Sequence, residues 1–312
     1  MQNYVDCDGD WSQRHPASLE GMTLYAFVLP ARMTALQDLC DKVVNDRPTN
    51  GAITAAPLLP AVLLVCASID FARSADARDG EKGYVVEKDV GFFVPIRLTD
   101  NGTTSFAALV PYLFVEPMPA VIAGREVYGF PKELADITFD EATVEFAAES
   151  LVIPTYGRNN RVVLRKVVDV SPTGAIVRTR VSGDLADFTR DVTEKVLGAL
   201  NLTAPGILGV STPTGFIDVP FVLLKQFRAA EAPLAACYQA IVRTVGTGDA
   251  FQHGEYLTGI IDVRVPRFDS LRIEETLGLF DPLGLGQPFH PLLSVAMKLD
   301  VDLLLGDVRW QA

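Results

Sequence analysis

The chain has 312 residues, of which 49% are hydrophobic and 21% charged, so its composition is that of a folded protein and not of a disordered one. Its formal net charge is −12 and its Lys and Arg residues form no cluster, which argues against binding to nucleic acid or to an anionic membrane. A small anionic substrate is compatible with this charge, because a pocket can be locally positive on an acidic protein.

The cysteines and histidines do not form recognisable sites. Cys7, Cys40, Cys66 and Cys237 are widely and irregularly spaced, so free thiols in a reducing compartment are expected. The three histidines lack the spacing of a zinc site, and we expect no metal and no cofactor. The first residues have neither the basic nor the apolar region of a signal peptide, which predicts a cytoplasmic protein.

The first third of the chain predicts two strands and one helix. Residues 24–30 are a strand candidate, and Thr34 with Gln37 is a capping-box pattern that would begin a helix reaching residue 44. Residues 51–69 carry no charge and are long enough to suggest a membrane span. Pro57 and Pro60 interrupt this stretch, so a buried strand at 61–69 is expected instead.

The remaining elements are mostly strands. Asp100-Asn101-Gly102 separates two apolar runs and predicts a hairpin over 91–115, because Asn-Gly supplies the positive φ angles of a tight turn. A second hairpin is expected between 162–170 and 175–181, a helix over 184–200, and strands at 258–265 and 293–303. Residues 204–220 are interpreted as a long loop. The class is therefore α+β, mainly β, with antiparallel pairing.

The segment 117–136 is the one that suggests chemistry. Lys132 follows Phe130-Pro131, and an apolar run ends at Ala123 just upstream. Tyr128 and Phe130 alternate, as they would on one face of a strand. Desolvation in such surroundings would lower the pKa of the lysine and free its amine to attack a carbonyl. A solvated lysine whose stem covers an aromatic side chain is the plainer interpretation of the same residues.

The motif Gly124-Arg125-Glu126-x-x-Gly129-Phe130-Pro131-Lys132 resembles the signature of the acetoacetate decarboxylase superfamily. The resemblance implies a single domain over 1–312, folded as an antiparallel β-barrel or cone with flanking helices, and a homo-oligomer. It also implies that Lys132 forms a Schiff base with a small keto acid. Arg125, Glu126, Tyr128 and Phe130 become candidates for substrate binding, with a structural role equally open to Arg125 and Glu126.

The sequence departs from the family at three positions and keeps a candidate for a further family acid. A second lysine follows the first in the family, whereas Glu133 stands here. The family's pocket arginine aligns with Met22, and its pocket glutamate aligns with Val65 or Cys66. A further family acid corresponds to Glu87 or Asp89, either of which is a candidate for proton transfer.

These departures favour an aldolase-dehydratase-like lyase over acetoacetate decarboxylation. A lysine imine is an electron sink that supports both reactions, so decarboxylation of a β-keto acid stays an alternative. A non-catalytic protein that binds a small ligand on the same fold is the rival from another class, and a lipid-binding barrel would need no lysine in its pocket.

Overall fold

The structure is a computed structural model that describes residues 5, 13–202, 218–232, 234–282, 284 and 286–312. Its strands in chain order are β1 (Ala17–Pro30), β2 (Ile53–Pro57), β3 (Ala61–Ser74), β4 (Val85–Asp100), β5 (Thr103–Glu116), β6 (Lys132–Asp140), β7 (Glu145–Val152), β8 (Val163–Val181), β9 (Asp218–Arg228), β10 (Ala236–Arg264), β11 (Leu293–Leu303) and β12 (Asp307–Gln311). The helical elements are α1 (Met33–Cys40), η1 (Asp41–Asn45), α2 (Met118–Ala123), η2 (Gly124–Tyr128), α3 (Leu185–Ala199) and α5 (Ile273–Leu277), with η1 and η2 as short π-helical turns.

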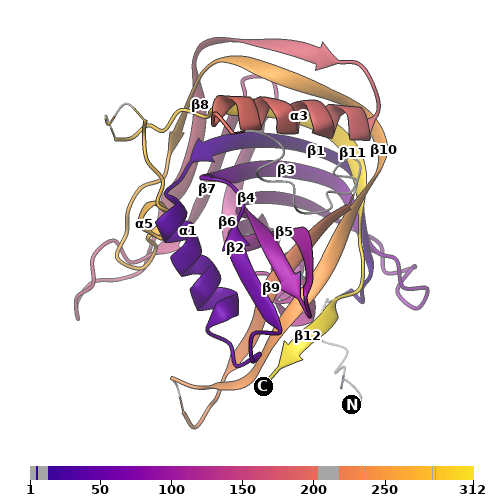
Figure 1. The fold of residues 1–312 in the computed structure, drawn as a ribbon, viewed down its shortest axis with the longest axis vertical. Helices are drawn as coiled ribbons and strands as arrows, with labels where there is room; N and C mark the ends of the chain where they lie inside the picture. The colour runs from indigo at the N-terminus through magenta and orange to yellow at the C-terminus, as the bar shows by residue number, and fades with distance from the viewer. Residues whose placement is uncertain (1–4, 6–12, 203–217, 233, 283, 285) are drawn as a thin grey trace.

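The strands form one sheet that closes on itself (Figure 1). Its order runs β2-β4-β3-β1-β11-β10-β8-β7-β6-β5-β9, and β4 also pairs with β5. The predicted class, mainly β with a few helices, is confirmed. Most pairs are antiparallel as expected, but β5 lies parallel to β6 and to β9, so the sheet is mixed. The reason is that α2 and η2 form a crossover between β5 and β6, which returns the chain in the same direction.

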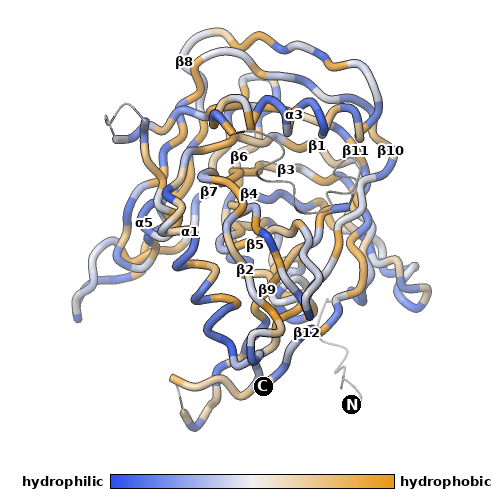
Figure 2. The backbone as a smooth tube through the Cα atoms, in the orientation of Figure 1, coloured by the Kyte–Doolittle hydropathy of each residue, from blue (hydrophilic) through white to orange (hydrophobic). Residues whose placement is uncertain are grey.

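Both faces of β1 are buried, and they meet different surroundings. Tyr25 and Phe27 belong to the main hydrophobic core, whereas the alternate residues Leu24 and Ala26 line a cavity. Helix α3 lies over this second face and packs Phe188 against Ala26. Figure 2 shows hydrophilic and hydrophobic stretches along α3, as expected for a helix with one face toward the protein. The cavity therefore lies between the β1 face and α3.

Several elements predicted from the sequence are confirmed. The hairpin is formed by β4 and β5, with Asn101 at φ 49° and Gly102 at φ 84° in its turn. The helix expected over 184–200 is α3, where the Asp184 side chain caps the N-terminus by accepting a 2.8 Å hydrogen bond from the backbone N–H of Asp187. The uncharged stretch 51–69 folds into β2 and the first part of β3. No helix in the described part of the chain is long and apolar enough to cross a membrane.

Two local predictions are wrong. Residues 163–181 form the single long strand β8 and no hairpin, because Gly174, at φ 92°, lies in a register shift against β10 instead of a turn. The early helix begins at Met33, with Arg32 at its N-cap and no side-chain capping bond, so Thr34 lies inside the helix. Cys7 and most of the loop predicted at 204–220 lie outside the described residues.

Candidate active site

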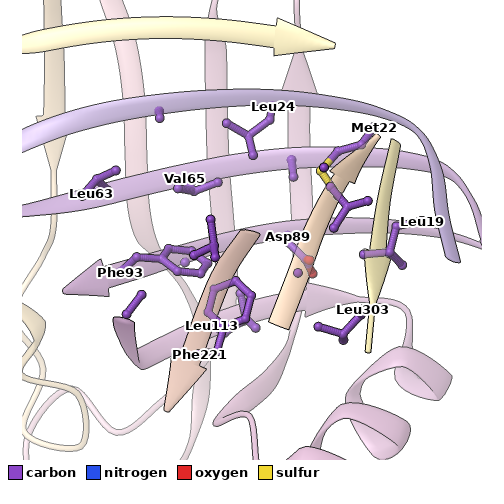
Figure 3. Close-up of a pocket in the computed structure, with 18 of the residues that line it drawn as sticks. Leu19, Met22, Leu24, Leu63, Val65, Asp89, Phe93, Leu113, Phe221 and Leu303 are labelled. Atoms are coloured by element: carbon purple, nitrogen blue, oxygen red, sulfur yellow. The ribbon is translucent and has the colours of Figure 1, made fainter. Parts of the chain in front are cut away.

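The cavity has a volume of about 450 Å³ and is enclosed by β1, β3, β4, β11, α3 and the α2–η2 crossover. Figure 3 shows its interior, with the carboxyl group of Asp89 surrounded by apolar side chains. Among the described residues, the ionisable side chains that line it are Arg14, His15, Arg73, Glu87, Asp89, Tyr128 and Lys132. A mostly apolar cavity with a few convergent polar groups is typical of a small-molecule site.

Lys132 is the first residue of β6 and extends into this cavity. Its side chain is 11% exposed, and its Nζ donates a hydrogen bond of 2.5 Å to Glu87 Oε1. Gly124 of the crossover lies against the lysine stem, since a Cβ built at residue 124 would come within 2.7 Å of Lys132 Cδ and 2.8 Å of Cε. The glycine at the start of the motif therefore provides the space that the lysine side chain occupies.

Glu87 and Asp89 both line the cavity, so the structure brings together the two acids that the sequence offered as alternatives. They are two residues apart on β4 and therefore point to the same face. Desolvation by burial, followed by the charge of Glu87, raises the pKa of Asp89 well above its ordinary value. Its Oδ1 has no hydrogen-bond partner among the described residues. The raised pKa favours the protonated form of Asp89 beside the Lys132–Glu87 ion pair.

The pKa of Lys132 does not move in the direction expected from burial alone. Desolvation, the largest single effect, lowers it, but the charges of Glu87 and Asp89 and the hydrogen bond to Glu87 together raise it above its ordinary value. The prediction of a lowered pKa is therefore wrong. The reason for the raised pKa is the carboxylate of Glu87, which contacts the amine directly although it is forty-five residues away in sequence.

His15 is a cavity residue that sequence reasoning missed. Its ring packs edge-on against Tyr128 at a centroid distance of 4.6 Å, and neither ring nitrogen has a hydrogen-bond partner among the described residues. Burial and the charge of Lys132 lower the pKa of His15 to about 4, so the imidazole is neutral at neutral pH. A histidine outside any metal-ligand spacing gives no local sequence signal of this position.

The other motif residues divide between the cavity and the protein surface. Tyr128 and Phe130 line the cavity, but they belong to η2 and the connection after it, not to a strand. Arg125 and Glu126 are exposed and lie outside the lining residues. Arg125 Nη1 instead donates a 2.8 Å hydrogen bond to the backbone carbonyl of Lys132, so it supports the start of β6.

The three positions where the sequence departs from the family can now be located in the structure. Glu133 is exposed and absent from the cavity lining, as expected for the residue after Lys132 on a strand. Met22 and Val65 point into the cavity, whereas Cys66 is part of the main core. The two polar family positions are thus occupied by apolar side chains that face the cavity.

Among the described residues, no group of three or more His, Cys, Asp or Glu side chains is placed to hold a metal ion. Within the described part of the chain, Glu87 and Asp89 are the two carboxyl groups of the cavity, and the ammonium group of Lys132 contacts Glu87 directly.

Residues 52–173 match the sequence model of the family described as acetoacetate decarboxylase. No curated protein sequence matches the chain significantly. Among solved structures, an acetoacetate decarboxylase is 12% identical with a TM-score of 0.59, covering 95% of this chain and 90% of that one. Acetoacetate decarboxylase from Legionella pneumophila is 14% identical with a TM-score of 0.56, covering 94% and 87%.

A third similar structure is the enduracididine biosynthesis enzyme MppR in complex with pyruvate. It is 13% identical with a TM-score of 0.54, and the alignment covers 97% of this chain and 93% of MppR. At these identities the likeness establishes a common fold. The fold is that of acetoacetate decarboxylase-like proteins. Together with the family match, it confirms the resemblance to the acetoacetate decarboxylase superfamily that the motif predicted.

Proposed function

We propose that this protein is a lyase that forms a Schiff base between Lys132 and a keto acid and then carries out aldol or dehydration chemistry. The observation that carries the proposal is the Lys132 amine, which lies inside a mostly apolar cavity with its Nζ 2.5 Å from Glu87 Oε1. An amine must lose its proton before it attacks a carbonyl, and a carboxylate in direct contact can accept that proton.

The first steps follow from this pair. When a keto acid displaces water from the cavity, the ammonium proton passes to Glu87 and the neutral amine adds to the ketone carbon. Loss of one water from the carbinolamine gives the protonated imine, and Asp89, whose raised pKa favours its protonated form, would protonate the departing hydroxyl. His15 adds neutral ring nitrogens that can bind a substrate oxygen.

The arrangement of the two acids favours the aldol branch. At this stage Glu87 holds the ammonium proton, and Asp89 has given its proton to the departing hydroxyl. The imine makes the neighbouring C–H acidic, and the ionised Asp89 can remove that proton to give the enamine. The enamine attacks an aldehyde, the new alkoxide takes a proton, and loss of water completes a dehydration. A base and a neutral acid on one face of β4 supply both proton transfers. The MppR complex with pyruvate makes a pyruvate-like donor the first compound to test.

Two other functions are each favoured by one observation. Decarboxylation of a β-keto acid is favoured by the apolar side chains of Met22 and Val65 in the cavity, because a desolvated carboxylate loses carbon dioxide more readily. Binding without catalysis is favoured by the raised pKa of Lys132, since a protonated amine is no nucleophile.

Parallel assays of the two reactions separate these functions. Enamine formation exchanges the methyl protons of pyruvate for deuterium in heavy water, which proton NMR measures, and decarboxylation releases carbon dioxide from acetoacetate. We expect enzyme-dependent exchange that Lys132→Ala abolishes. Carbon dioxide release without exchange would replace the aldol branch by decarboxylation, and neither reaction in a folded sample would support the binding protein.

A further inference from the structure

The cavity has apolar walls that keep accessible surface. Leu63 and Val65 of β3 and Phe93 of β4 are partly exposed, although all lie on inner strands of the sheet. Their sequence neighbours on the opposite face, Leu64 and Phe92, are 0% exposed. Apolar surface that stays accessible inside a cavity loses contact with water when an apolar ligand fills it, and this burial is favourable.

The apolar wall extends well beyond the reach of a small keto acid. From Asp89 the cavity-facing residues of β4 continue through Gly91 and Phe93 to Pro95, a distance of about 20 Å at the rise of a strand. Leu63 pairs with Phe93 in the sheet, so β3 widens the same wall. In Figure 3, Leu63, Val65 and Phe93 lie together to one side of Asp89.

Helix α3 covers this wall with side chains of the same kind. Val192 and Val196 line the cavity, and so do Thr189 and Thr193. The threonine hydroxyls donate to backbone carbonyls of α3 itself, to Leu185 and Thr189 respectively, so they are already satisfied within the helix. The helix therefore adds no charged group to this part of the cavity.

We propose that the keto acid bound by Lys132 carries a medium-length apolar chain, which lies along β3 and β4 beneath α3. This inference rests on the proposed function and names its substrate class. The carbonyl and carboxylate stay near Lys132 and His15, and the chain extends past Val65 toward Phe93. In the aldol direction the keto acid that carries this chain is the condensation product, and the chain comes from an apolar aldehyde. The chain itself takes no part in bond making, so the imine step still releases one water.

Chain length is the variable that tests this inference. Borohydride trapping rates on Lys132 would be compared at low concentration for pyruvate, α-ketobutyrate, α-ketohexanoate and α-ketooctanoate. Each added methylene is expected to raise the second-order rate about fourfold until the cavity is filled. Equal rates for the whole series would overturn the proposal.

Two variants locate the chain. Leu63→Trp fills the apolar part of the cavity, and it is expected to abolish the rise with chain length while pyruvate still traps. Leu151→Trp is the matched control, because Leu151 is 65% exposed on β7 and lies outside the lining, so the rise should persist. A rise that survives Leu63→Trp would contradict the placement. Val65→Phe repeats the test if Leu63→Trp does not fold.

Failure of the lysine chemistry gives a different result from failure of the chain site. If no keto acid traps, the proposed function fails, and calorimetry of butanone, hexanone, octanone and decanone binding to Lys132→Met then tests the cavity alone. An affinity for these ketones that rises with chain length, and that falls when Leu63→Trp is added to Lys132→Met, would support the apolar-chain site. Absence of binding by every ketone would refute it.

Discussion

Gly124→Ala is expected to separate activity from stability. The added Cβ would lie 2.7 Å from Lys132 Cδ and 2.8 Å from Cε, whereas carbon atoms in ordinary contact are about 3.5–4.0 Å apart. The end of the lysine must therefore shift by about 1 Å, which moves the amine from the position in which it contacts Glu87. A misplacement of about 1 Å costs on the order of 100-fold in rate, equal to about 2.7 kcal/mol of activation free energy.

The fold should tolerate the same change. Gly124 has helical angles, with φ −65° and ψ −37°, and alanine is favoured over glycine in a helix by about 1 kcal/mol. The atoms that must move are the flexible end of a side chain and not backbone. We therefore expect the free energy of unfolding of Gly124→Ala to equal or exceed that of the unsubstituted protein.

The assay compares trapping rates on Lys132 with urea denaturation of the same samples. Gly198→Ala in α3 is the matched control, because it also replaces a helical glycine, but a Cβ there meets no described atom within 4 Å. It should trap at an unchanged rate. A trapping rate for Gly124→Ala within about twofold of the unsubstituted protein, where about 100-fold is expected, would refute the packing argument.

Three further substitutions test the electrostatics of the cavity. Glu87→Gln removes the largest of the contributions that raise the pKa of Lys132, so this pKa should fall. The pH profile of trapping should move toward acid, and loss of the proton acceptor should lower its plateau. Asp89→Asn replaces an acid whose pKa is raised by burial. Such an acid costs stability above its unfolded pKa, so the variant should be more stable to urea at about pH 7, with no difference below about pH 4. His15→Phe keeps the ring contact with Tyr128 but loses both nitrogens, and it should lower pyruvate trapping by about tenfold, roughly the value of one hydrogen bond. The pKa of His15 is lowered from 6.5 to about 4. The unsubstituted protein therefore loses stability as the pH falls through this window, and His15→Phe should lose less stability over the same range.

The sequence predicted those features that depend on local pattern. The β4–β5 hairpin follows from Asn101-Gly102, and α3 follows from an apolar period with Asp184 at its N-cap. Gly174 was misassigned to a turn, because a glycine with positive φ serves a bulge as well as a hairpin. The choice depends on the pairing of β8 with β10, which neither strand encodes alone.

The site was predictable only in part for the same reason. Lys132 is identified from a contiguous motif, whereas the sequence leaves open whether its successor, Glu133, faces the pocket. The direction of the Lys132 pKa depends on Glu87, which β4 brings into contact from outside the motif. His15 enters the cavity from an N-terminal segment without regular structure, where no periodicity indicates which way a side chain faces.

The sequence shows that apolar residues replace two polar residues of the family, but it does not show which surface of the cavity they belong to. Met22 and Val65 stand where the family has polar residues, which suggested altered chemistry at the lysine. The structure places Val65 beside Leu63 and Phe93, which remain partly accessible, whereas Met22 lines the cavity as a buried side chain. An apolar side chain at Val65 is what the proposed apolar-chain substrate requires.

Borohydride reduction in the presence of pyruvate determines whether Lys132 forms an imine. We expect a peptide that contains Lys132 and carries the mass of one reduced pyruvate, absent from Lys132→Ala and retained in Glu133→Gln, whose side chain lies outside the cavity. A folded protein that gives no adduct across the pH range, or one whose adduct lies on another lysine, would contradict imine formation on Lys132.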